Sequence, residues 1–81
     1  MTSKLVEIIA HFAIFLEFAD ESVVELEAAV KQQEDLAFRL QQLSPSERAE
    51  FARTLAEIAS GMPQPEHRKY LEALPHAVGI A

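Results

Sequence analysis

Apolar residues recur along this chain with the spacing of helices rather than of strands. Four segments rich in Ala, Leu, Glu, Gln and Arg are separated by turn-forming residues at 20–22, 43–45 and 61–65. No segment alternates apolar and polar positions as a half-buried strand does. The predicted helices span residues 3–19, 22–43, 45–60 and 65–74, followed by an extended tail over 75–81. Short turns between helices indicate an all-α, three- to four-helix antiparallel bundle.

The first predicted helix is apolar nearly all the way round. Its broad face, which we expect to form the core, carries Leu5, Ile8, Ile9, Phe12, Phe15, Leu16 and Ala19. The opposite side is polar, yet it also carries Ile14 and Phe18. Because a helix that is apolar all round is usually buried on more than one side, these two residues predict a protein interface. The simplest geometry is an isologous dimer with the first helices antiparallel; the alternative is that both side chains complete the core.

The second predicted helix has an apolar stripe with one polar interruption. The stripe consists of Leu26, Ala29, Val30, Leu36, Ala37, Leu40 and Leu43. Gln33 interrupts it, either as a polar register device or as a solvated edge, and we favour the edge. Val24 and Phe38 fall outside the stripe and join the predicted interface. Asp20 and Ser22 are both good N-caps, which favours a break before this helix.

The third and fourth predicted helices carry clear start and stop signals. Ser44-Pro45-Ser46-Glu47 is a capping box with proline at the first helical position. The buried stripe that follows consists of Phe51, Ala52, Leu55, Ile58 and Ala59. Gly61 is placed as the residue after the helix end. In the fourth helix Tyr70, Leu71 and Leu74 form one apolar edge, and we expect Pro75 to stop the helix.

Charge and size add two expectations about partners. The 81 residues carry a net charge of −6 and no cysteine, which excludes a disulfide scaffold and thiolate chemistry. Association is the remaining common support for so short a chain, so we expect a homodimer. Five acidic residues cluster around the predicted turn between the first two helices: Glu17, Asp20, Glu21, Glu25 and Glu27. They are either a solvated face with favourable charge at a helix start or a docking surface for a basic protein partner.

The candidate chemistry argues against an enzyme, a cofactor or a metal site. Glu7 and His11 share a helix face, but the ligand patterns of metal-binding bundles are missing. No serine or threonine occupies a nucleophile elbow, and two isolated glycines cannot form a phosphate loop. The apolar run over 5–19 contains charged residues and is shorter than the ~20 residues that span a bilayer. We therefore expect a folded helix in a cytoplasmic protein without a membrane role.

Protein binding is the leading functional hypothesis. The sequence predicts a small, acidic, non-catalytic homodimer that acts as an inhibitor, an immunity or antitoxin-type protein, or a regulatory subunit. One alternative is a DNA-binding regulator, with a helix-turn-helix formed by the second and third helices. Such a protein would need Arg48, Arg53, Arg68 or Lys69, and the glutamates around Arg48 oppose contact with phosphates. A second alternative is a purely structural helical dimer.

Overall fold

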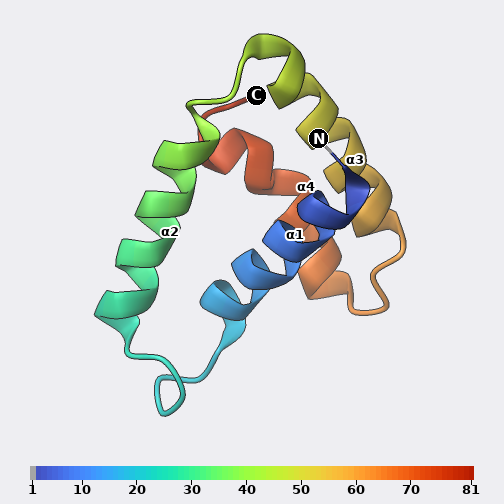
Figure 1. Cartoon of the computed structure of the whole chain (residues 1–81). Helices are drawn as coiled ribbons and strands as arrows, with labels where there is room; N and C mark the ends of the chain where they lie inside the picture. The colour runs from blue at the N-terminus through green and yellow to red at the C-terminus, as the bar shows by residue number, and fades with distance from the viewer. Residues whose placement is uncertain (1) are drawn as a thin grey trace.

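The computed structural model describes residues 2–81, which form helices joined by turns and contain no strand. The helices are α1 (Ser3–Phe18), α2 (Leu26–Leu40), α3 (Pro45–Ser60) and α4 (Pro65–Ala77). α1 is central, because it packs against α2, α3 and α4, while α3 and α4 also pack on each other. The chain enters the loop along α1 and leaves it along α2, so the two helices form a V that opens away from the loop (Figure 1). The all-α prediction is confirmed, and the arrangement is that of a helical bundle.

The predicted break between the first two helices is confirmed. A side-chain oxygen of Asp20 accepts a hydrogen bond from the backbone N–H of Ser22 at 2.8 Å, which turns the chain directly after α1. The backbone N–H of Val24 also donates to the carbonyl of Asp20, at 3.0 Å. These bonds hold residues 20–24 in a turn, so α2 begins at Leu26 and not at Ser22.

α3 has the predicted bounds and the predicted capping box. The Ser44 hydroxyl accepts from the backbone N–H of Glu47 at 3.2 Å, and the Glu47 carboxylate accepts from the backbone N–H of Ser44 at 2.8 Å. These two bonds satisfy N–H groups that have no partner within the helix. The bond from the Ser44 backbone N–H to the Glu47 carboxylate, together with the Ser44 side chain, lowers the pKa of Glu47 below its usual value.

α4 continues through Pro75, which the sequence predicted to stop it. Proline lacks an N–H and its ring crowds the carbonyl four residues earlier, but its fixed φ is compatible with a helix, and backbone bonds hold the turn beyond it. The helix then ends in a Schellman motif: Ile80 N–H donates to the carbonyl of Pro75 at 2.9 Å, and Gly79 N–H donates to that of His76 at 3.1 Å. Gly79 takes the left-handed φ of 81°, whereas Gly61 stays right-handed. The prediction of an extended tail from residue 75 is therefore wrong, because the helix and its C-terminal motif continue to Ile80.

Substituting alanine for Gly79 is expected to destabilise the fold by about 1–2 kcal/mol, because a Cβ is strained in the left-handed region. That Cβ would also lie only 3.2 Å from Nε2 of Gln41. Urea denaturation of Gly79→Ala against wild type measures the loss. Gly61→Ala is the matched control, since its Cβ meets nothing nearer than 3.6 Å; an equal loss in both variants would contradict the assigned role of Gly79.

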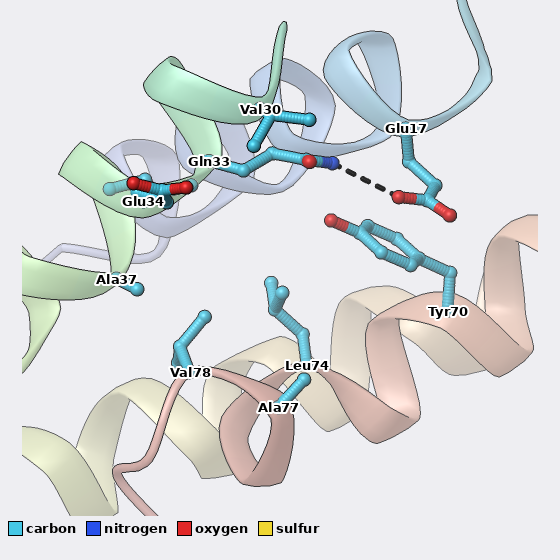
Figure 2. A pocket seen from close by; sticks show the side chains of 10 residues that line it. Glu17, Val30, Gln33, Glu34, Ala37, Tyr70, Leu74, Ala77 and Val78 are labelled. Atoms are coloured by element: carbon cyan, nitrogen blue, oxygen red, sulfur yellow. Dashed lines mark hydrogen bonds between the residues drawn. The ribbon is translucent and has the colours of Figure 1, made fainter. Parts of the chain in front are cut away.

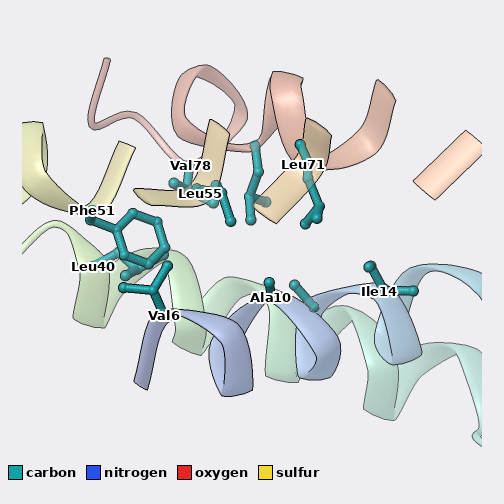
Figure 3. Packing of buried hydrophobic residues seen from close by; sticks show 11 residues of the cluster. Val6, Ala10, Ile14, Leu40, Phe51, Leu55, Leu71 and Val78 are labelled. Atoms are coloured by element: carbon teal, nitrogen blue, oxygen red, sulfur yellow. The ribbon is translucent and has the colours of Figure 1, made fainter. Parts of the chain in front are cut away.

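The hydrophobic core joins a small-residue face of α1 to larger side chains of α3 and α4. Val6, Ala10 and Ala13 are fully buried on α1. Figure 3 shows Val6 and Ala10 opposite Phe51, Leu55 and Leu71, which supply most of the volume. The buried cluster consists of Val6, Ala10, Ala13, Ile14, Leu40, Phe51, Leu55, Ala59, Leu71, Leu74 and Val78. The stripe predicted for the third helix is confirmed, because Phe51, Leu55 and Ala59 are buried in it.

The face of α1 that packs into the core agrees only in part with the predicted one, since Leu16 is buried and Ile9 packs against the core as expected. Ile14 is only 8% exposed and belongs to the core, so its predicted place on an exposed interface is wrong. Four residues predicted to be buried are instead exposed: Leu5, Ile8, Phe12 and Phe15. The physical reason is that Ala10 and Ala13 let α1 approach α3 and α4 closely. The larger side chains of α3 and α4 then fill the core between the helices.

α2 is held mainly by α1 and by its own C-terminal end. Leu40 is buried, whereas Leu26 and Val30 of the predicted stripe are exposed. The Arg48 guanidinium donates to the carbonyl oxygens of Leu43 and Gln41, fixing the turn between α2 and α3. The N-terminal part of α2 therefore stands away from α4, and a cleft remains between the two helices.

Candidate functional site

A row of large apolar side chains lies on the outer side of α1. Leu5, Ile8, Phe12 and Phe15, which we call the α1 apolar face, are 53%, 57%, 43% and 47% exposed. Their spacing of three, four and three residues places them on one side of the helix. In an ordinary monomer the solvent side of a helix is mostly polar, so four large apolar side chains in one exposed row form an apolar patch of the kind that marks interaction sites.

Charged residues border the α1 apolar face. Lys4 and Glu7 form an ion pair with 3.5 Å between Nζ and Oε2; the Lys4 side chain is largely exposed and the Glu7 side chain is half-buried. His11 is exposed as well. An apolar strip with a polar margin has the anatomy of a protein interface, in which a dry centre is surrounded by a hydrated rim.

The other residues predicted for the interface are not gathered into one surface. Phe18 is 42% exposed, but its ring contacts His67 and Tyr70 with ring centroids 4.8 and 5.7 Å away, so it helps to join α1 to α4. Val24 is half-buried in the turn before α2. Phe38 is 61% exposed on α2. Whether Phe18, Val24 and Phe38 take part in an interface stays a prediction.

The cleft between α2 and α4 is the second candidate site. It has a volume of about 320 Å³. The residues that line it are Glu17 of α1, Val30, Gln33, Glu34, Leu36 and Ala37 of α2, and Tyr70, Leu74, Ala77 and Val78 at α4. Figure 2 shows apolar side chains of α2 and α4 facing across the opening, with Glu17 and Tyr70 together at one end.

Polar contacts hold residues of the cleft lining. Nε2 of Gln33 donates to Oε1 of Glu17 at 3.0 Å (Figure 2). Nε2 of Gln41, beyond the end of α2, donates to the carbonyl of Val78 at 2.8 Å. Gln33 is half-buried and links α2 to α1 through a solvent-exposed hydrogen bond, so its interpretation as a solvated edge of the stripe, with a polar register device as the alternative, stays a prediction. These two bonds connect α2 to α1 and the turn after α2 to the end of α4.

Tyr70 titrates in an unusual environment at the end of the cleft. Partial burial of the phenol raises its pKa above the ordinary value of 10.0, and the Glu17 carboxylate raises the pKa further; a hydrogen bond with Gln33 opposes the shift. Burial and a nearby negative charge both disfavour the phenolate. The phenol therefore stays protonated to higher pH than in an unfolded chain.

The phenolate absorbance of Tyr70 is expected to appear with a midpoint above pH 10. Tyr70 is the chain's only tyrosine, so the absorbance reports on this residue alone. Because the pKa is raised in the folded state, stability falls as the pH rises from 10 through the folded value. Glu17→Gln is expected to lower the midpoint without restoring the ordinary value, since burial is the larger cause. A midpoint unmoved by Glu17→Gln would refute the proximity of the two groups.

The acids predicted to form a docking surface divide into two kinds. Glu17 accepts from Gln33, and Asp20 accepts from Ser22, which lowers the pKa of Asp20. Both therefore have structural roles. Glu21, Glu25 and Glu27 are exposed and form no ion pair within residues 2–81. These three residues, which we call the acidic surface, surround the turn before α2 and the first turn of that helix.

Other candidate chemistry from the sequence is not assembled into a site. Within the described residues no three His, Cys, Asp or Glu side chains lie close enough to hold a metal ion. Arg48, considered above as a DNA contact, is occupied with backbone carbonyls. None of the helices over residues 2–81 has the length and apolar character needed to cross a bilayer.

The sequence pattern predicted neither the residues that line the cleft nor the residues that form the α1 apolar face. The interruption of an apolar stripe by Gln33 was the one signal that pointed to the cleft.

Comparison of the chain with protein-family models, curated proteins and solved structures gives no match.

Proposed function

We propose that this protein acts by protein–protein association. It forms a homodimer through the α1 apolar face and presents the acidic surface to a basic protein partner, as an inhibitor or regulatory subunit. The observation that carries this proposal is the exposure of Leu5, Ile8, Phe12 and Phe15 on a helix whose other face is already in the core.

The free energy available from covering this face is large for a small protein. Fully burying a Leu, Ile or Phe side chain is worth about 1.5–3 kcal/mol. Folded domains are stable by only about 5–15 kcal/mol. The residues that α1 buries include small ones, and they leave Leu5, Ile8, Phe12 and Phe15 exposed to water; the buried ones are Val6, Ala10, Ala13, Ile14 and Leu16. Association stabilises the folded chain by removing that side from water.

A second copy of the chain fits this face because the row of side chains is self-complementary. Leu5 and Phe15 lie at equal distances along α1 on either side of Ala10, and so do Ile8 and Phe12. A two-fold axis level with Ala10 pairs Leu5 with Phe15 of the partner subunit. The same axis pairs Ile8 with Phe12 of the partner subunit. Each small or branched side chain then meets an aromatic ring, the interdigitation that isologous interfaces require.

The acidic surface supports a second, heterologous contact. Glu21, Glu25 and Glu27 project from the α1–α2 turn region, and the chain as a whole carries a net charge of −6. A field of one sign attracts an oppositely charged protein and speeds its encounter. Reversing the three charges to lysine is expected to abolish capture of a salt-eluted basic protein from source-cell lysate. Capture that persists unchanged would leave the acidic surface without a binding role.

Dilution of isotope-labelled protein, followed by NMR, tests the homodimer at the level of residues. The amide signals of Ile8 and Phe12 are expected to shift as the dimer dissociates, whereas that of Phe38 on α2 stays fixed. Shifts centred on Phe38 would place the interface on α2 instead. Spectra that do not change over the whole concentration range, together with a monomeric mass, would overturn the proposal.

A further inference from the structure

The cleft between α2 and α4 combines apolar walls with a negatively charged end. Val30 and Ala37 form one wall, and Leu74 and Ala77 form the other. Glu17 and Glu34 are the charged residues of the lining, which includes no Lys, Arg or His. A ligand that matches this lining has an apolar body and a positive charge, because a buried apolar surface and an unneutralised carboxylate each favour such a partner.

The cleft has the size of a small-molecule site. Its volume of about 320 Å³ lies at the lower end of the ~300–1,000 Å³ typical of ligand pockets. Two hydrogen bonds hold lining residues in place: Gln33 donates to Glu17 at 3.0 Å, and Gln41 donates to the carbonyl of Val78 at 2.8 Å. α1 packs on both α2 and α4, so it bridges the two helices that form the walls.

We propose that this cleft binds a small monocationic amphiphile, an alkylamine whose tail lies between Val30 and Leu74 and whose ammonium group reaches Glu17. Gln33 donates to Oε1 of Glu17, so Oε2 is the oxygen that accepts from the ammonium group. The adjacent Tyr70 ring adds a cation–π attraction. A fatty-acid anion of the same length is repelled by Glu17 and Glu34. The site is separate from the α1 apolar face and does not depend on the proposed dimer.

Comparison of three ten-carbon probes tests the charge preference. The probes are n-decylamine, decanol and decanoate, each below the concentration at which it forms micelles. Tyr70 is the chain's only tyrosine and tryptophan is absent, so the intrinsic fluorescence reports on the end of the cleft. Decylamine is expected to bind at least about tenfold more tightly than decanoate. Equal affinity for the two, or no binding of decylamine, would overturn the proposal.

A filled-cleft variant tests the location. Ala77→Phe places a ring in the cleft and is expected to weaken decylamine binding at least about tenfold by occupying its volume. Ala73→Phe is the matched control, because Ala73 is an exposed residue of α4 outside the lining; its affinity should equal that of wild type. Circular dichroism checks that both variants fold. Unchanged binding by a folded Ala77→Phe would place the amine elsewhere on the molecule.

A charge variant keeps the test decisive if Ala77→Phe does not fold. Glu17→Gln retains the acceptor for Gln33 and removes the charge, so decylamine is expected to bind about fivefold more weakly. Glu72→Gln removes an exposed charge of α4 outside the cleft and should leave the affinity unchanged. Equal losses in the two variants would indicate general attraction to an acidic protein and would refute the site. Phe12→Glu is expected to bind decylamine as wild type does.

Discussion

A Phe12→Glu variant is expected to remain monomeric at concentrations at which the wild-type protein is a dimer. Phe12 lies near the middle of the α1 apolar face, opposite Ile8 of the partner subunit in the proposed arrangement. The substitution therefore places two unpaired carboxylates at the centre of one dimer, and burying each of them costs several kcal/mol. We expect the dissociation constant to rise at least about a hundredfold, which corresponds to ~2.7 kcal/mol.

The same substitution should leave the folded monomer intact. Phe12 is 43% exposed and does not belong to the buried cluster, so glutamate at this position is tolerated by α1. Phe38→Glu is the matched control, because Phe38 is even more exposed, at 61%, and lies on α2. Sedimentation velocity compares the masses of the three proteins. A dimer that survives Phe12→Glu, or that dissociates only in Phe38→Glu, would contradict the assignment of the interface to α1.

A Phe51→Ala variant is expected to lose about 3–5 kcal/mol of stability. Phe51 has no solvent exposure and is among the largest fully buried side chains of the described residues. It lies in the core beside Val6 of α1 and Leu40 of α2 (Figure 3). Truncation removes the ring from the contact of three helices and leaves a cavity. A loss of this size is a large share of the stability of so short a chain.

Urea denaturation at matched protein concentration measures this loss, because dimerisation makes the apparent stability depend on concentration. Phe38→Ala is the control for removal of a phenyl ring, and it is expected to change the free energy of unfolding by less than about 0.5 kcal/mol. If Phe51→Ala unfolds as wild type does, the packing of α1 and α2 on α3 is not the one described.

The local signals of α3 were sufficient to predict its position and its buried face. Ser44, Pro45 and Glu47 fix the first turn through neighbouring backbone groups, and such short-range bonds depend little on the rest of the molecule. The stripe that contains Phe51 and Leu55 has polar residues on its other side, so only one orientation buries it. The sequence could therefore define both the bounds of this helix and the side that enters the core.

α1 differs because both of its sides are apolar. The pattern placed Phe12 and Phe15 in the core because they share the broad apolar face of the helix, but the core opposite α1 contains the large side chains of Phe51 and Leu71. That leaves room for Ala10 and not for a ring. The choice depends on the volumes that α3 and α4 contribute, which no periodicity within α1 contains. The expectation of a second buried side follows from the sequence, whereas the identity of that side does not.

The cleft depends on three helices that are distant in sequence. Glu17, Gln33 and Tyr70 meet only because α1, α2 and α4 pack together, and each residue alone resembles an ordinary surface position.

The end of α4 was missed for a local reason: Pro75 suggested a stop, but the Schellman motif around Gly79 allows one further turn. That turn carries Ala77 and Val78, which complete the lining of the cleft.

Sedimentation equilibrium of the wild-type protein tests the central proposal most directly. The chain has a mass of 9.0 kDa. We expect the weight-average mass to approach twice that value at high concentration and to fall toward the monomer on dilution, with a single dissociation constant. A mass of one chain at every concentration, with the α1 apolar face still in water, would contradict the account.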